Sequence, residues 1–284
     1  MKELFHDKVY RVSIDAGMTC PNRDGKLGTR GCIFCSQGGS GDFAEDKMLS
    51  VTEQIEAGKK RILQKAKNCK YFIAYFQAFT NTYASVDYLE KIFTEAINHK
   101  DVVVLSIATR PDCLGEDVLA LLERLNKIKP VWVELGLQTI HPATAAFIRR
   151  GYPLSTYDEA VQKLNEAKIK VITHVILGLP GESHEDMLKT VDYVCSHGAW
   201  GIKLQLLHIL KNTDLATYYE KNPFHIMSLE EYTDLVVECV KRVPDDMVIH
   251  RLTGDGDKKS LIAPMWSGDK KRVLNEMNRY LAGK

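Results

Sequence analysis

The stretch VYRVSIDAGMTCPNRDGKLGTRGCIFC, residues 9–35, opens with an apolar, β-branched run and ends in a loop that holds three cysteines. Eleven residues separate Cys20 from Cys32, and two separate Cys32 from Cys35. A closed structural zinc site needs four ligands, and a disulfide framework uses an even number of cysteines. The run VYRVSI therefore predicts a strand, and the three thiols that follow it need another explanation.

Apolar, β-branched runs like VYRVSI recur along the chain, bounded by turn residues. They lie at residues 9–14, 71–76, 102–108, 131–137, 171–177 and 201–207. Segments with helical spacing separate them, such as VTEQIEAGKKRILQKA and SVDYLEKIFTEAINHK. Six such units predict an α/β protein with a parallel sheet and helical crossovers. They form either a partial (β/α)6 barrel or an open doubly wound sheet, which periodicity alone does not separate.

The alternation weakens after about residue 211, where a helical segment, SLEEYTDLVVECVKRV, is followed by a Gly/Asp-rich tail. No low-complexity linker divides the chain. A chain of 284 residues with 45% hydrophobic content can bury a substantial core. We therefore expect a barrel core over residues 1–210 and a C-terminal helical extension over residues 211–284, packed as a single domain.

The composition indicates a cytoplasmic protein without a membrane segment. Seven cysteines are an odd number, the start MKELFHDKVYRV has charges where a signal peptide is apolar, and no apolar run approaches ~18 residues. The formal charge of +1 offers no strong overall field for nucleic acid. Basic clusters are therefore local, and the sequence alone favours solvated surface for each of them: 59–61, 149–150, 258–259 and 270–272.

The three cysteines follow the first predicted strand, so in a barrel they lie at the carboxyl end, where active sites of this architecture sit. Cys20, Cys32 and Cys35 can hold three irons of a four-iron, four-sulfur cluster. The fourth iron is then open to an amine and a carboxylate of a small molecule. The alternative is a zinc site completed by a distant histidine or cysteine. The other cysteines, Cys69, Cys113, Cys195 and Cys239, are expected to be small buried hydrophobes.

The cysteine loop resembles that of the radical S-adenosylmethionine (SAM) enzymes, which usually space three cysteines by three and two residues. This chain keeps the second spacing, in CIFC, and has a longer first gap. It is similar to a subgroup typified by YhcC and YtqA, related to the elongator catalytic subunit and coproporphyrinogen dehydrogenase. The motifs that carry this resemblance span nearly the whole chain: SIDAGMTCPNRDG, CIFCSQGGSGDF, YFQAFTNTY, ATRPDCL, ELGLQT, ILGLPGE, LLHILKNT, HRLTGDG and APMWS.

The resemblance implies two cofactors, a 4Fe-4S cluster on Cys20, Cys32 and Cys35, and SAM. The segment from Gln77 to Thr80 replaces a glycine-rich segment that meets the methionyl amino group. Gln138 and Arg150 match residues that contact SAM, and an arginine suits its carboxylate. His174 stands where relatives often carry an acidic ribose partner, and Gly178 and Gly181 bring backbone near the adenine. Weaker indications attach to Glu134 and Thr109.

The implied reaction is reductive cleavage of SAM to a 5′-deoxyadenosyl radical, which abstracts hydrogen from a substrate. An electron donor such as flavodoxin or ferredoxin is implied. Polar residues at strand ends are candidate substrate contacts: Tyr83, Gln205, His208 and Arg251. Trp266 is either a stacking platform for a base or a core residue.

The subgroup resembles enzymes that mature the wobble uridine of transfer RNA (tRNA). This implies conversion of 5-carboxymethylaminomethyluridine to 5-aminomethyluridine, with Arg251 or Lys203 facing the carboxylate, by a transferase or an oxidoreductase. Two alternatives remain: radical oxidation or decarboxylation of a small metabolite or tetrapyrrole, and a non-catalytic protein that carries haem or a cluster.

Overall fold

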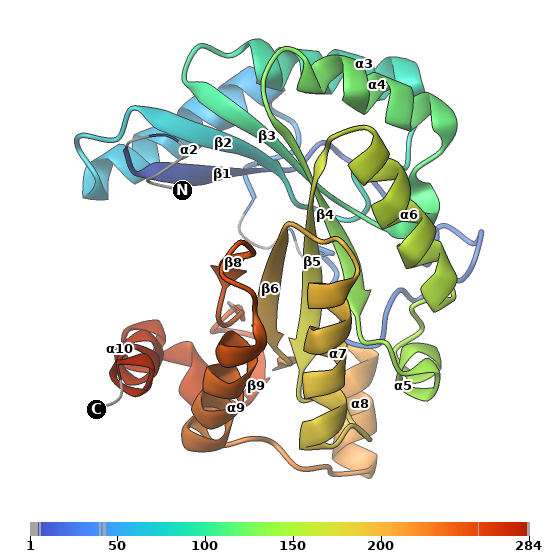
Figure 1. Cartoon of the computed structure of the whole chain (residues 1–284), viewed down its shortest axis with the longest axis vertical. Helices are drawn as coiled ribbons and strands as arrows, with labels where there is room; N and C mark the ends of the chain where they lie inside the picture. The colour runs from blue at the N-terminus through green and yellow to red at the C-terminus, as the bar shows by residue number, and fades with distance from the viewer. Residues whose placement is uncertain (1–4, 6, 40, 42–43, 255, 283–284) are drawn as a thin grey trace.

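The computed structural model describes residues 5, 7–39, 41, 44–254 and 256–282. Its main sheet has seven parallel strands, in the order β1-β2-β3-β4-β5-β6-β8. The strands are β1 Val9–Ile14, β2 Tyr71–Phe76, β3 Val102–Thr109, β4 Val131–Gln138, β5 Lys170–Leu177, β6 Gly201–Leu206 and β8 Val248–Arg251. Because their spatial order follows the chain, the sheet has no switch point of the doubly wound kind. It is a curled half-barrel, which confirms the α/β partial barrel and adds a seventh strand to the six predicted (Figure 1).

Helices surround this sheet, and most of them cover its outer face (Figure 1). They are α2 Val51–Lys65, α3 Val86–Asn98, α4 Glu116–Asn126, α5 Pro142–Phe147, α6 Leu154–Glu166, α7 His184–Ser196, α8 Asp214–Lys221, α9 Leu229–Arg242 and α10 Lys270–Leu281, with 3-10 turns at Pro111–Cys113 and Met265–Gly268. Three of them begin at a serine whose side chain and an acidic residue three positions on cap each other reciprocally: α2, α7 and α9. Such caps satisfy backbone N–H groups that the first helical turn leaves unpaired.

The C-terminal part contributes to the core as well as covering it. β8 pairs with β6 of the main sheet, and α9 packs between α7 and α10. A second, antiparallel pair joins β7, Ile209–Leu210, to β9, Leu261–Ala263. The predicted division at residue 210 stays a prediction. Within the described residues, no helix is both long and apolar enough to cross a bilayer.

Alternate residues of each strand face the inside of the half-barrel. In β4 the outward residues Val131, Val133 and Leu135 join the main core under the helices, whereas Trp132 packs with Ile73, Val104 and Ile172 in a separate inner cluster. Further along β4, the inward positions become polar. The inside therefore has an apolar floor at the amino ends of the strands and a polar layer above it.

The half-barrel does not close by backbone pairing, because β1 and β8 are the edge strands. Side chains bridge these edges: Arg11 donates from its guanidinium to Nδ1 of His250 at 3.0 Å. The His250 ring packs edge-on against Trp132 and Trp200, with centroids 5.6 and 5.2 Å apart. Burial first, and then the Arg11 charge, lower the pKa of His250 to about 3, so its ring is neutral and accepts this bond.

Candidate functional site

A pocket of about 400 Å³ lies inside the half-barrel at the carboxyl ends of the strands. It brings together eight of the nine predicted cofactor and cluster positions: Cys20, Cys32, Cys35, Gln77, Thr80, Gln138, Arg150 and His174. The ninth, Gly178, is not among the residues that line it; its backbone adopts φ +90° and its N–H points to Sδ of Met187 at 3.0 Å. Residues 13 to 254 in sequence thus converge on one cavity, as expected for this architecture.

Several weaker predictions also fall on this pocket. Gln205, His208, Arg251, Glu134 and Thr109 line it. Tyr83 is not among the lining residues.

Trp266, the other residue left open, packs against the core, with its ring centroid 5.7 Å from that of Tyr232. Its indole N–H donates to the carbonyl of Met227 at 2.9 Å. These contacts favour the core interpretation of Trp266.

The loop that carries the cysteines is held by hydrogen bonds rather than by regular structure. The N–H of Arg23 bonds to the carbonyl of Cys20 at 2.7 Å, and the N–H of Cys35 bonds to that of Cys32 at 3.0 Å. The amide of Asn22 donates to the carbonyl of Arg149 at 2.8 Å and lies 3.5 Å from Sγ of Cys32. Asn22 thus fixes the loop against the end of α5.

The three thiols suit an iron-sulfur cluster. All three cysteines are free. Burial, followed by the nearby Cys35 and Cys20, raises the pKa of the Cys32 thiol to about 11. Buried neighbouring thiolates are costly alone, whereas a metal centre offsets their charge and thiolate sulfur is its preferred donor. Of the four remaining cysteines, Cys239 is buried, and Cys69, Cys113 and Cys195 are only partly so.

Arg150 is bound by backbone carbonyls on several sides. Its Nη1 donates to the carbonyls of Leu137 and Thr139, at 3.1 and 2.6 Å, and its Nε donates to that of Tyr152 at 3.1 Å. Its guanidinium carbon lies 4.9 Å from the Tyr152 ring centroid. Arg150 therefore ties the end of β4 to the loop after α5 at the same time as it lines the pocket. Replacing Arg150 would therefore disturb the fold, whereas replacing a residue that only contacts a ligand would leave the fold intact.

Gln138 sits at an irregular point of β4. Its φ is +65°, in the left-handed region that non-glycine residues rarely adopt, and the pairing with β5 shifts between Gly136 and Gln138. With its amide nitrogen facing the strand, it donates to the carbonyls of Leu137 and Gly136 at 2.9 and 3.2 Å. A Cβ on Gly136 would lie 2.5 Å from the end of the Gln138 side-chain amide. Glycine at 136 thus makes room for this side chain.

A buried ionic network lies in the polar layer beneath the pocket. Its centre is Glu134, which is completely buried and paired with Lys203, itself 1% exposed. Glu134 also accepts from Ser106 Oγ at 2.8 Å, and its carboxylate lies 3.5 Å from Arg11. Although burial works in the opposite direction, Lys203 and Arg11 hold the pKa of Glu134 well below its usual range. Burial lowers the pKa of Lys203 to about 7.

His174 is oriented by this network. Its Nε2 lies 2.7 Å from Oε2 of Glu134, and burial, followed by Lys203, lowers the pKa of His174 to about 4. The neutral ring therefore donates Nε2–H to Glu134, and Nδ1 carries the lone pair. A histidine at the pocket wall with this tautomer accepts a hydrogen bond from a hydroxyl.

Sequence reasoning missed Arg11, Tyr75, Ser106 and Arg23 as parts of the site. Arg23 donates to the carbonyls of Cys35 and Ser36, at 3.2 and 2.5 Å, and its guanidinium lies 5.5 Å from the Phe79 ring centroid. The available signal was a charge inside an apolar strand, as with Arg11 in VYRVSI and Lys203 in GIKLQL. Such charges are rarely buried unless paired.

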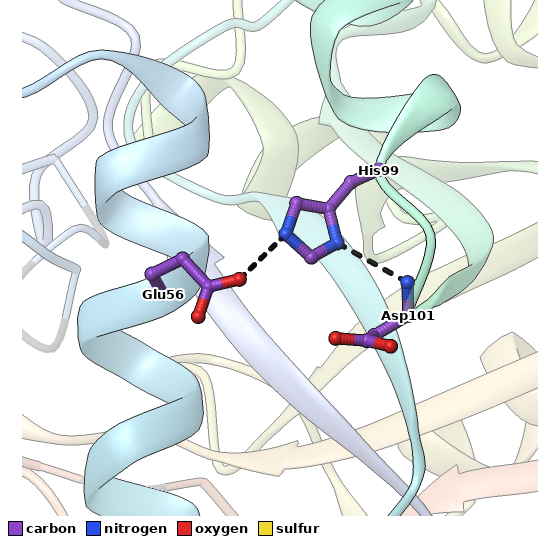
Figure 2. A group of neighbouring side chains, drawn as sticks. All are labelled: Glu56, His99 and Asp101. Carbon is purple, nitrogen blue, oxygen red and sulfur yellow. Dashed lines mark hydrogen bonds and ion pairs between the residues drawn. The ribbon is translucent and has the colours of Figure 1, made fainter.

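A second group of candidate metal ligands lies elsewhere, at Glu56, His99 and Asp101 (Figure 2). His99 Nε2 lies 2.8 Å from Glu56, and His99 Nδ1 accepts from the N–H of Asp101 at 3.2 Å. The ammonium of Lys59 lies 2.7 Å from Glu56 and 2.5 Å from Asp101. Because Lys59 already supplies the positive charge between the carboxylates, this group stabilises the contact of α2 with the start of β3.

Two families match most of the chain between them. The Radical SAM superfamily matches residues 25–194, and the Radical_SAM C-terminal domain matches residues 199–282. The chain is 44% identical over 281 residues to YtqA of Bacillus subtilis strain 168, and this alignment covers 99% of this chain and 87% of YtqA. It is 36% identical over 278 residues to YhcC of Escherichia coli strain K12, and this alignment covers 98% of this chain and 88% of YhcC.

More distant matches include one enzyme and one solved structure. A tRNA uridine(34) acetyltransferase of Methanocaldococcus jannaschii is 25% identical over 197 residues, which are 68% of this chain and 35% of that enzyme. The structure of Elp3 from Methanocaldococcus infernus, without residues 1–46, aligns with a TM-score of 0.71 at 18% identity. The alignment covers 96% of this chain and 63% of that one, and it shows a shared fold.

Proposed function

The chain belongs to the radical SAM superfamily, in the expected YtqA/YhcC-like subgroup, and on this premise we propose that it modifies the wobble uridine of tRNA. It is a radical SAM enzyme, and this family uses a 4Fe-4S cluster and SAM. The observation that supports tRNA is the match over 68% of the chain to an enzyme named for uridine 34 of tRNA. The proposed conversion is 5-carboxymethylaminomethyluridine to 5-aminomethyluridine.

In this proposal Cys20, Cys32 and Cys35 hold the cluster, and the supporting observation is that all three line the same pocket. When bound there, the cluster and SAM would supply the radical chemistry needed to remove a hydrogen atom from a carbon beside the secondary amine. Gln138, at the end of β4, and Arg150, in the loop after α5, orient the methionine end of SAM. Nδ1 of His174 accepts a hydrogen bond from a ribose hydroxyl, because its Nε2–H already donates to Glu134.

In this proposal the pocket binds a substrate that carries an anionic group. Arg251, at the end of β8, and Gln205, near the end of β6, both line the pocket. In the proposed function Arg251 faces the carboxylate of the modified base, since a guanidinium donates two parallel hydrogen bonds to a carboxylate. Lys203, the other residue considered from the sequence, is engaged with Glu134 beneath the pocket.

Two measurements test the proposal. Anaerobically reconstituted protein should bind one four-iron cluster, and Cys20→Ala, Cys32→Ala and Cys35→Ala should each abolish it, whereas Cys69→Ala should not. Purification with stoichiometric zinc and no iron would contradict the cluster assignment.

Mass spectrometry of tRNA nucleosides from cells with and without the gene should show that the carboxymethylaminomethyl form accumulates when the gene is absent. Unchanged wobble nucleosides, together with intact SAM cleavage in vitro, would reject tRNA and favour a small metabolite as substrate.

A further inference from the structure

A second cleft lies on the outer surface beside the cysteine loop, between α5 and α8. It has a volume of about 350 Å³. Its apolar part consists of Ile33, Phe147 and Tyr218, with the two aromatic centroids 4.9 Å apart. The charged residues around it are Arg30, Arg149, Asp214 and Lys221.

Two pairs of consecutive residues separate this cleft from the inner pocket. Cys32 lines the pocket and Ile33 lines the cleft; likewise Arg150 lines the pocket and Arg149 lines the cleft. The loop and α8 are fixed to each other, since the N–H of Leu215 donates to the carbonyl of Ile33 at 2.8 Å. One layer of backbone therefore divides the cysteines from the outer surface.

Arg149 contacts both sides of this layer. Its φ of +59° is unusual for a residue other than glycine. Its carbonyl lies 3.8 Å from Sγ of Cys32, while its guanidinium lies 2.7 Å from the carboxylate of Asp214 in the cleft. The path from the outer surface to a cluster ligand thus runs through a single residue.

The cleft carries an excess of positive charge. Three of its lining residues are cations and one is a carboxylate. Asp214 is shared between Arg149 and Arg30, which lies 3.6 Å away with 72% of its side chain exposed. A small apolar floor with a basic rim is typical of a transient interface with an acidic protein, in which charge guides association.

The geometry points to this cleft as the docking site of an acidic one-electron carrier protein, such as flavodoxin or ferredoxin. This inference rests on the proposed assignment of the cluster to Cys20, Cys32 and Cys35. SAM and substrate occupy the pocket side of the cysteines in that assignment, so an electron must arrive from the other side. The carrier is oxidised by one electron and the cluster is reduced by that electron; no proton or group is transferred.

The test uses reconstituted holoprotein with SAM and measures its affinity for purified flavodoxin and ferredoxin at low and high salt. Lys221→Glu and Arg30→Glu together should weaken binding about tenfold at low salt and reduce its salt dependence. Flavodoxin-driven reduction of the cluster should slow accordingly. Cleavage of SAM driven by dithionite, a small chemical reductant, should be unchanged. Lys127→Glu is the matched control, because Lys127 is 73% exposed and lies in the turn between α4 and the amino end of β4.

Each outcome decides the inference separately from the proposed function. Equal affinity of the double variant and wild type for both carriers, or no binding of either carrier, would overturn the docking site. Loss of tRNA binding in the double variant, with carrier binding unchanged, would assign the cleft to RNA and also overturn it. Lys221→Gln with Arg30→Gln repeats the measurement if charge reversal prevents folding. No cleavage with dithionite in wild type would contradict the proposed function alone.

Discussion

Glu134 and Lys203 form a buried pair whose two members depend on each other. Lys203→Met should lower the free energy of unfolding by about 3 kcal/mol, because breaking a buried pair leaves an uncompensated charge. The expected loss is at the lower end of the usual range, since Arg11 still lies 3.5 Å from the carboxylate. Urea unfolding measures it. Adding Glu134→Gln should restore part of the loss, and strictly additive effects would show that the pair is not coupled.

The neutral state of His174 makes stability depend on pH. Its pKa is about 4 in the folded protein and about 6.5 in the unfolded chain. Between these values the unfolded chain binds the proton first, so acid favours unfolding. The free energy of unfolding should fall as pH drops from 6.5 toward 4, by up to about 3 kcal/mol from this residue.

His174→Gln should make that dependence shallower, with part of it remaining because the pKa of His250 is also lowered. Urea unfolding at several pH values tests this. His225→Gln is the control, since His225 is 69% exposed. An identical pH slope in wild type and His174→Gln would show that His174 does not titrate in this way.

At the scale of single elements, α2 packs unusually closely on β1. A Cβ at Gly58 would lie 2.4 Å from Cγ1 of Val12, which is 2% exposed. Alanine usually stabilises a helix interior relative to glycine by about 1 kcal/mol. Here overpacking should cost about 1–3 kcal/mol and make Gly58→Ala destabilising overall. Thermal unfolding of this variant and of Gly58→Ala with Val12→Ala tests it, since the second change should relieve the clash. A stabilised single variant would refute the close contact.

The strand pattern was predictable because both faces of these strands are buried, so apolar runs mark their ends to within one residue. β8 was not predicted: its four residues, VIHR, are all half-buried, and the Arg and His have partners that only the tertiary fold supplies. The placement of Cys20, Cys32 and Cys35 at one pocket was predictable from local spacing and family resemblance. The layer of Arg11, Glu134 and Lys203 was not, because the sequence does not show that three separate strands turn their charges toward the same interior.

At the scale of the whole molecule, a net charge of +1 has to be reconciled with a tRNA substrate. If tRNA binds, the exposed Lys258 and Lys259 near the pocket-lining Gly254 are well placed to contact phosphate. Replacing both with Ala should reduce the slope of log affinity against log salt by roughly 1 to 2 units. Filter binding of tRNA over a salt series measures the slope.

Two further variants control this salt measurement. Lys127→Ala, near the amino end of the sheet, should leave the slope unchanged. Trp266→Ala should lower the melting temperature rather than the salt slope, because Trp266 packs on the core. Equal slopes for wild type and the double lysine variant would place the phosphate contacts elsewhere.

Side chains, and no backbone hydrogen bonds, join the two edge strands of the sheet. Where a closed barrel pairs its last strand with its first, this protein has the contact of Arg11 with His250. This contact between two side chains can break without the loss of any backbone pairing between strands. Separating the two edge strands would therefore cost side-chain contacts rather than a row of backbone hydrogen bonds.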